Sequence, residues 1–284
     1  MPVLNEERYV AQAATSILEQ TFGDLELIVV DDGSTDRTGE IVAAIAESDP
    51  RIRLIHTDGQ GLVDALNTGI ALARGTYIAR MDADDVSLPE RFAQQVHELD
   101  TRPALGVLGT RVRYIDAAGR TVGAWDVPVG TPLVHWTLAF GTPIAHPTAM
   151  MRKGALPDVP YRTSDPHAED YDLWVRLSRE TMLDNLAEPL LERRVHGNSV
   201  SDQNLSAQEA STLRIRQRAI GDLLGREPSA SQVGALTKPQ SAAELVTAAR
   251  LIGRLYLASR GGAAVRRDAA RRLAAAAKSL WRSR

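Results

Sequence analysis

Three carboxylates, Asp82, Asp84 and Asp85, follow one another closely after the predicted strand of residues 76–81. Asp82-Ala83-Asp84 is an Asp-x-Asp element, and two carboxylates at this spacing in a tight turn can reach one hard divalent cation. Mg²⁺ and Mn²⁺ prefer such oxygen ligands and keep open positions for phosphate oxygens. Taken alone, an Asp-rich turn after a strand is more often a solvated loop or a helix cap.

A second acidic pair, Asp31 and Asp32, opens the segment Asp31-Asp32-Gly33-Ser34-Thr35-Asp36. Asp-Gly turns and Asp caps are common, so this segment is ambiguous by itself. A carboxylate accepts hydrogen bonds from N–H and O–H groups, so one of the pair could bind a nucleobase or a ribose.

Two later elements add candidate groups for catalysis and metal binding. Glu169 and Asp170 open a predicted helix, where Asp170 could act as a general base on an acceptor hydroxyl, although helix starts favour acids in any case. His196 ends a predicted strand, and a neutral imidazole there could ligate a metal, although a lone histidine in a turn is usually a surface residue.

The elements that must position these groups alternate between helix and strand along the first hundred residues, which is typical of βαβ units. Apolar spacing predicts helices over residues 7–20, 36–47, 61–74 and 169–180, and strands over residues 25–30, 52–56, 76–81, 105–114 and 190–195. Both acidic clusters then lie at carboxyl ends of parallel strands, where open α/β sheets bind ligands. The sequence predicts an α/β fold with a mostly parallel, Rossmann-like sheet flanked by helices.

Composition narrows the class of protein further. The formal net charge of −3 argues against a dedicated nucleic-acid binder, and 44% hydrophobic residues indicate an ordinary globular protein. The absence of cysteine excludes disulfides and thiolate sites and leaves the cytoplasm as the default compartment. No run of apolar residues is long enough for a membrane span.

Together, the order and spacing of these motifs resemble the inverting glycosyltransferases of family 2, which have the GT-A fold, over about residues 1–201. The matching segments are Met1 to Glu7, Val30 to Ser34, Leu66 to Gly69, Asp82 to Asp85, Glu169-Asp170, and Arg194 to His196 with Ser199 and Ser201. The resemblance implies donor binding by Pro2, Val3, Leu4, Glu6, Asp31, Asp32, Asn67, Asp82, Ala83 and Arg194, metal binding by Asp84 and His196, base catalysis by Asp170, and an acceptor-side position for Glu169.

The reaction implied by this resemblance is a single in-line displacement that inverts the anomeric configuration. Asp170 would take the proton of the attacking acceptor hydroxyl, while Mn²⁺ or Mg²⁺ would stabilise the leaving diphosphate. The donor would be a nucleotide-diphosphate sugar, commonly a UDP-sugar, and the acceptor a carbohydrate or lipid-linked hydroxyl in surface polysaccharide or glycoconjugate synthesis.

The start of the chain departs from the family pattern. Family members carry a first strand of about five apolar residues before the Met-Pro step, whereas this sequence starts at Met1. The hypothesis that follows is that Met1 is an internal methionine and that the natural protein starts upstream.

The last part of the sequence has a different character, rich in Ala, Leu and Arg, so we predict a catalytic domain over residues 1–203 and a helical extension over residues 204–284. A helical stripe of residues 245–256 would pack on the catalytic domain or on another subunit of a homo-oligomer. A second stripe, from Val265 to Leu280 and Trp281, is predicted to lie opposite most of the arginines. That helix could contact the inner face of a membrane, although a solvated charged face is the more frequent case.

Two other classes of protein remain as alternatives at this point. A sugar-phosphate nucleotidyltransferase shares a related sheet and metal use, but it would begin with a glycine-rich loop bearing Arg and Lys, unlike Asn5-Glu6-Glu7. A non-catalytic nucleotide-sugar binding protein or degenerate transferase would need no base, and the joint presence of Asp82, Asp84 and Asp170 argues against it.

Overall fold

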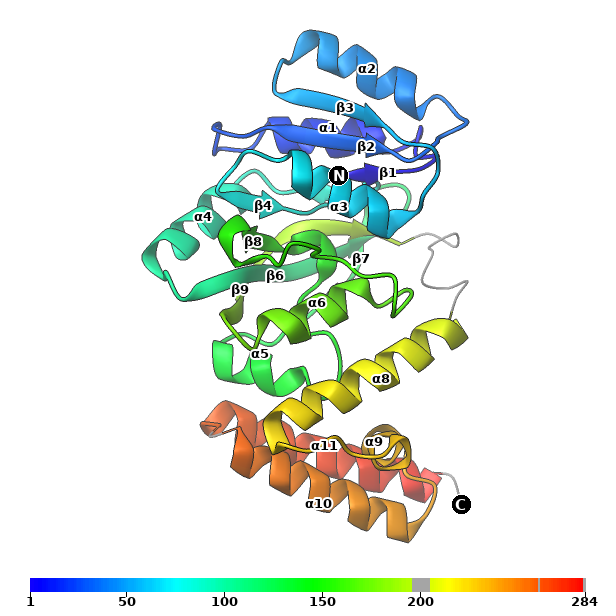
Figure 1. The fold of residues 1–284 in the computed structure, drawn as a ribbon, viewed down its shortest axis with the longest axis vertical. Coiled ribbons are helices and arrows are strands. Elements are labelled where there is room, and N and C mark those ends of the chain that lie inside the picture. Colours follow the sequence, from blue (N-terminus) through cyan, green and yellow to red (C-terminus); the bar gives the residue numbers. More distant parts are fainter. Residues whose placement is uncertain (196–204, 260, 283–284) are drawn as a thin grey trace.

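The computed structural model describes residues 1–195, 205–259 and 261–282. These residues form an α/β structure in which helices cover two sheets, and four C-terminal helices lie at the end of the molecule opposite α2 (Figure 1). The predicted α/β class with C-terminal helices is therefore confirmed.

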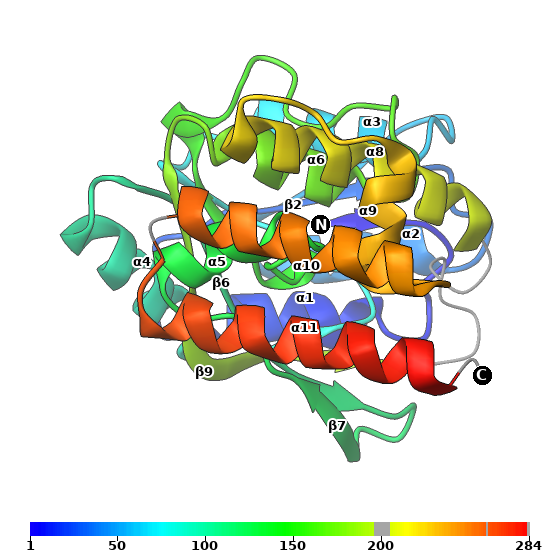
Figure 2. The ribbon, with the colours of Figure 1, turned by 90° about the horizontal axis from the view of Figure 1, so that it is seen from below.

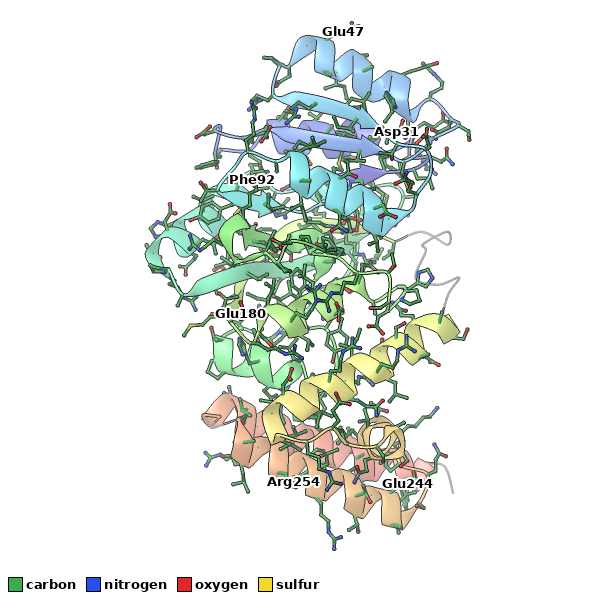
Figure 3. The ribbon with its side chains drawn as sticks, in the orientation of Figure 1. Asp31, Glu47, Phe92, Glu180, Glu244 and Arg254 are labelled. Atoms are coloured by element: carbon green, nitrogen blue, oxygen red, sulfur yellow. The ribbon has the colours of Figure 1, made fainter. Side chains whose placement is uncertain are left out.

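The first sheet is parallel and has the strand order β1-β2-β3. Its strands are β1 (Pro2–Val3), β2 (Leu27–Asp31) and β3 (Ile52–His56), and its helices are α1 (Val10–Leu18), α2 (Thr38–Ser48) and α3 (Leu62–Leu72). All five residues of β2 are buried, which accounts for its unbroken apolar sequence before Asp31. The strand thus delivers Asp31 and Asp32 to the carboxyl edge of the sheet, where Figure 3 labels Asp31.

The second sheet is mixed, with the order β4-β8-β6-β9-β5 and with β7 paired to β6. Parallel pairing joins β6 to β9, and the other pairs are antiparallel. β6 and β7 form a hairpin, whereas the remaining antiparallel pairs join strands that are distant in the sequence. The strands are β4 (Tyr77–Ala79), β5 (Val86–Ser87), β6 (Leu105–Ile115), β7 (Thr121–Trp125), β8 (Met150–Arg152) and β9 (Met182–Arg194). The flanking helices are α4 (Arg91–Thr101), α5 (Thr131–Thr137) and α6 (Glu169–Leu177), with short 3₁₀ turns His146–Thr148 and Lys153–Ala155.

A pocket of about 720 Å³, lined by both apolar and polar groups, lies between the two sheets, beside β1. It is lined by the first half of β2, by β4, and by residues of α3 and α4. The amino group of Met1 is buried at this place, donates to the carbonyl of Ile28 at 2.8 Å, and has its pKa lowered to about 5 by burial and by Arg80. The hypothesis that strand residues precede Met1 in the natural protein stays a prediction.

The C-terminal helices pack on the rest of the chain through two apolar clusters. They are α8 (Leu205–Leu224), α9 (Ala230–Thr237), α10 (Ala242–Ala258) and α11 (Ala263–Arg282). Ile215 and Ala219 of α8 join the core around Trp174 of α6, whereas Leu255 and Val265 of α10 and α11 join a cluster around Trp136 and Phe140. The predicted domain boundary near residue 203 is followed at once by a helix that shares the core of the first part.

Two details of the predicted helical stripes are wrong. On α10 the buried residues are Ala248, Leu251, Ile252 and Leu255, while Val246 is 49% exposed. On α11 Val265, Ala269 and Ala276 are buried, but Trp281 is 82% exposed. A helix turns by about 100° per residue, so Trp281 points to the same outer side as Arg267 and Lys278 rather than to the packed stripe.

Candidate active site

The acidic loop between β4 and β5 brings Asp82, Asp84 and Asp85 together, with one ligand atom from each within 4.8 Å of the others. Asp85 is buried, and its Oδ1 accepts from the backbone N–H of Arg194 at 3.0 Å. Its Oδ2 has no hydrogen-bond partner among the described residues. Burial, followed by the charges of Asp82 and Asp84, raises the pKa of Asp85 well above its usual value.

This donor set fits a hard divalent cation, since three carboxylates lie close together and one buried carboxylate oxygen has no hydrogen-bond partner among the described residues. Asp84, the predicted ligand, belongs to the group, and Asp82 and Asp85 lie beside it. His196, the other predicted ligand, lies outside the described residues.

Arg80 is a buried cation at this loop that the sequence analysis missed. Its Nη2 forms an ion pair with Oδ1 of Asp82 at 2.5 Å, and its Nε and Nη1 have no hydrogen-bond partner within the described ranges. A single arginine at the end of an otherwise apolar strand was the available signal, because burying such a side chain is costly without an acidic partner.

The carboxyl group of Asp170 lies in the first turn of α6, next to the buried side chain of Glu169. Its Oδ1 accepts from the N–H of Tyr171 at 2.7 Å. Burial, and then repulsion from Glu169, raises the pKa of Asp170 to about 7, against the opposing charge of Arg80. A carboxylate with this pKa is suited to take a proton at neutral pH.

Tyr161 connects the acidic loop with the start of α6. Burial raises the pKa of its hydroxyl, Arg80 opposes this shift, and Asp170, Glu169 and Asp82 add to it. These charges all act on one phenol, so Asp82 of the acidic loop and Asp170 share one electrostatic environment.

Tyr161 is held through its hydroxyl by His146, which the sequence analysis missed, and through its backbone by Asn67, which was predicted to bind the donor. Nε2 of His146 lies 2.8 Å from the Tyr161 hydroxyl, and burial lowers the pKa of His146 well below its usual value. Asn67 donates to the carbonyl of Tyr161 at 2.9 Å and accepts from its N–H at 3.0 Å. Asn67 therefore ties α3 to this loop, and its predicted contact with the donor stays a prediction.

The carboxylate of Asp32 holds the loop that follows β3. It accepts from the Thr57 hydroxyl at 2.7 Å and from the N–H groups of Gln60 and Gly61 at 2.9 and 2.6 Å. Burial alone would raise its pKa, but these hydrogen bonds outweigh burial and lower it. Oδ1 of Asp31 accepts from the N–H of Ser34 at 3.0 Å.

The loop after β1 is joined to the loop after β2 by hydrogen bonds. Asn5, at φ 55°, accepts from the N–H of Thr35 at 2.8 Å, and the N–H of Glu6 donates to the Thr38 hydroxyl at 2.8 Å. In this segment Val3 is buried, Pro2 is half-buried and Leu4 is 53% exposed. The predicted nucleoside segment thus lies at the same sheet edge as Asp31 and Asp32.

Arg194 is buried, and each of its three guanidinium nitrogens donates within the protein. The acceptors are the carbonyls of Asp84 and Asp116, both at 3.0 Å, and Oε1 of Gln12 at 2.9 Å. Its guanidinium carbon lies 4.4 Å from the centre of the Tyr9 ring. In this arrangement Arg194 fixes the acidic loop, and its predicted contact with the donor stays a prediction.

Comparison with known proteins places these motifs in a sequence family. Residues 1–159 match the family described as Glycosyl transferase family 2. An uncharacterized glycosyltransferase of Haemophilus influenzae is 30% identical over 231 residues, which cover 76% of this chain and 70% of that protein. The O-antigen biosynthesis glycosyltransferase WbnJ of Escherichia coli is 31% identical over 221 residues, covering 76% of this chain and 86% of WbnJ.

Solved structures match the fold over almost the whole chain. Residues 1–349 of Staphylococcus aureus TarS in complex with UDP-GlcNAc superpose with a TM-score of 0.60 at 18% identity, covering 99% of this chain and 87% of that one. The mannosyltransferase PcManGT from Pyrobaculum calidifontis, solved with GDP-Man and Mn²⁺, gives a TM-score of 0.59 at 20% identity, with 100% and 86% coverage. At these identities the likeness concerns the fold.

Proposed function

The chain belongs to glycosyl transferase family 2, and from this premise we propose that it transfers a sugar with inversion from a UDP-sugar to an acceptor hydroxyl, with Asp170 as the base. The observation that carries the proposal is the single environment shared by Asp170 and the acidic loop around Arg80 and Tyr161. A base and a diphosphate site must adjoin each other in any such transfer.

The nucleoside would bind at the carboxyl edge of the parallel sheet, against Pro2, Val3, Leu4 and Glu6 and beside Asp31 and Asp32. The lowered pKa of Asp32 keeps its carboxylate ionised, and this carboxylate already orders the backbone of Gln60 and Gly61. These contacts support a preformed pocket for the base. TarS has been solved with UDP-GlcNAc and PcManGT with GDP-Man, so the donor panel must include both bases.

Mn²⁺ or Mg²⁺ would be held by Asp84, with His196 as a second ligand and with Asp82 and Ala83 against the donor. When bound, the cation supplies positive charge for the leaving diphosphate. Two arginines fix the acidic loop. Arg80 pairs with the side chain of Asp82, and Arg194 donates to the backbone carbonyl of Asp84.

Asp170 would accept the proton of the acceptor hydroxyl while that hydroxyl attacks the anomeric carbon. Its raised pKa allows it to hold this proton after transfer, and Glu169 beside it would face the acceptor. Because one base on one face suffices, no covalent sugar intermediate is needed and the configuration inverts.

The acceptor class follows from the relatives. WbnJ is named for O-antigen biosynthesis, which supports a carbohydrate or lipid-linked acceptor in surface polysaccharide synthesis. The proposal leaves the transferred sugar to experiment, since its recognition depends on the shape of the pocket.

The test is a turnover assay on a panel of UDP- and GDP-sugars with Mn²⁺, in which hydrolysis reports donor use when no acceptor is present. We expect Asp170→Asn to lower turnover by about 10²–10⁴-fold while UDP binding, measured by calorimetry, stays within about twofold. Asp158→Asn, which removes an exposed carboxylate that belongs neither to the acidic loop nor to α6, is the matched control. UDP binding without turnover on any donor would instead indicate a nucleotide-sugar binding protein.

A further inference from the structure

The last two helices carry a charge that the rest of the chain does not share. Residues 241–284 contain ten Lys or Arg and two Asp or Glu, a formal charge of +8, so the remaining residues carry −11 of the total of −3. Figure 2 shows α10 and α11 side by side across the end of the molecule. The molecule therefore has a basic end and an acidic body.

The basic side chains lie on the outer side of this helix pair. Val265, Ala269 and Ala276 of α11 are buried, and Arg267, Arg271 and Lys278 on the opposite side are exposed. On α10, Arg250 and Arg254 are exposed, and Figure 3 labels Arg254 at the end of the molecule opposite Glu47. Spacings of four and seven residues place these charges along one face of each helix.

The two acids of the helix pair are used in local contacts. Asp268 is largely buried and accepts from the indole N–H of Trp136 at 2.7 Å and from Arg272 at 2.6 Å. Glu244 accepts from the N–H of Gln240 at the start of α10 at 2.7 Å. Asp268 also pairs with Arg271 at 3.1 Å, whereas within the described residues no ion pair joins either acid to Arg267 or Lys278.

Large apolar side chains stand among these exposed cations. Trp281 is 82% exposed and Leu257 is 77% exposed, and both point to the outer side of their helices, as does Val246 at 49%. A soluble polyanion gains nothing from such side chains, whereas a bilayer interface accommodates tryptophan and leucine beside arginine and lysine. No described helix is both long and apolar enough to cross a bilayer.

We propose that the outer face of α10 and α11 docks on an anionic phospholipid bilayer, with Arg254, Arg267 and Lys278 against the headgroups and with Trp281 and Leu257 in the interface. The acidic body is repelled by the same surface, so the charge asymmetry also orients the molecule with this end toward the lipid. Binding does not require the transfer reaction, so its test is independent of the proposed function.

The test is sedimentation of the full chain with vesicles of phosphatidylglycerol and phosphatidylcholine, against vesicles of phosphatidylcholine alone, at low and at 0.5 M salt. We expect binding to the anionic vesicles at low salt and its loss at high salt. The triple variant Arg254→Gln, Arg267→Gln, Lys278→Gln should bind about 100-fold more weakly. The control triple variant Arg37→Gln, Arg120→Gln, Arg226→Gln removes three exposed cations outside α10 and α11 and lowers the net charge equally, and its binding should stay within about twofold of the wild type.

The emission of Trp281 gives the second readout, because Trp136 and Trp174 are buried and the spectrum of Trp281→Ala subtracts the contribution of half-buried Trp125. Anionic vesicles should shift the emission to the blue, and Trp281→Ala should abolish the shift and weaken binding, while unchanged thermal melts show that the variants fold. Equal binding to both vesicle types, no binding at low salt, or equal binding of the two triple variants would overturn the proposal. Salt-sensitive binding to polyphosphate that competes with vesicles, without any Trp281 shift, would assign the face to a soluble polyanion instead.

Discussion

The central residue of the account is Asp170, whose ionisation depends on its neighbours. Burial and the charge of Glu169 raise the pKa of Asp170 to about 7, and Arg80 opposes the rise. A base works when it is deprotonated, so kcat/KM should increase about tenfold per pH unit below pH 7 and level off above it.

Glu169→Gln removes the negative charge beside this base, so the pKa of Asp170 falls and the acidic limb of the pH profile moves to lower pH. The measurement is kcat/KM for donor hydrolysis between pH 5 and pH 9. Glu180→Gln, beyond the other end of α6 and labelled in Figure 3, should leave the limb in place. A limb that moves to higher pH in Glu169→Gln would contradict the assigned environment.

Arg80→Met tests the same environment by removing a positive charge instead of a negative one. Loss of this buried cation removes the charge that lowers the pKa of Asp170, so the acidic limb should move to higher pH. It also removes the partner of Asp82, so the apparent KM for the donor should rise. Arg80→Lys, which keeps the charge, should restore the position of the limb in part. If the acidic limb does not move in Arg80→Met, the charge of Arg80 does not affect the pKa of Asp170, and the assigned environment is wrong.

At the scale of elements, the sequence predicted strands and helices most accurately where the apolar residues followed a single clear pattern. Residues 52–56 were predicted as a strand and are β3, and the predicted strand of residues 105–114 corresponds to β6. β9 was predicted over residues 190–195 but runs from Met182, because buried Asp184 and Asn185 break the apolar pattern. Their side chains bind Gly130 and Pro128, which are contacts that local sequence does not encode.

The residues of the candidate site also fall into those that the sequence predicted and those that it did not. Asp82, Asp84, Asp85 and Asp170 were predicted because strand ends and a helix start carry recognisable acids. Arg80, His146 and Tyr161 were missed, because their meaning depends on burial beside residues distant in sequence.

The pocket beside β1 gives a prediction about this element. β1 and β4 are outer strands of their sheets, and the lining of the pocket between them includes apolar side chains such as Phe22, Phe92 and Met150. An extension of about five β-branched residues before Met1 should lie in this pocket and pair with β2, raising the free energy of unfolding by about 3 kcal/mol or more for two buried side chains.

Urea unfolding of the extended chain measures this gain, and an extension of the same length made of Gly and Ser is the control. The Gly-Ser extension offers no apolar side chain and should give a smaller gain. Equal stabilities of the two extended chains would show that the pocket does not receive a strand.

At the scale of the whole molecule, α8 connects the other C-terminal helices with the region around Asp170, because its arginines pair with a residue in the loop before α6. Buried Asp165, in the loop before α6, accepts from Arg214 at 3.0 Å and from Arg218 at 2.6 Å. Burial would raise the pKa of Asp165, but these two arginines outweigh burial and lower it. The domain boundary predicted at residues 203–204 remains a proposal. These ion pairs join residues before the boundary to α8 after it, so we expect residues 1–203 and 204–284 to stabilise each other.

Arg218→Met should lower the free energy of unfolding by about 1–2 kcal/mol at neutral pH, a value reduced for the partial exposure of Arg218. Because the folded pKa of Asp165 is lowered, its contribution is present above the usual value of 3.8 and is lost as the pH falls below it. Arg179→Met breaks a more exposed pair with Asp222 and should cost less than about 1 kcal/mol. Equal losses in the two variants would contradict the role of α8.

The convergence of Asp84, its acidic neighbours and Asp170 on one donor site is tested most directly by anomalous diffraction from crystals grown with Mn²⁺ and UDP. We predict one manganese peak that contacts Asp84 and the diphosphate, in the same cavity into which the Asp170 carboxyl group points. A peak away from the acidic loop, or an Asp170 carboxyl group that opens into a different cavity, would contradict the account.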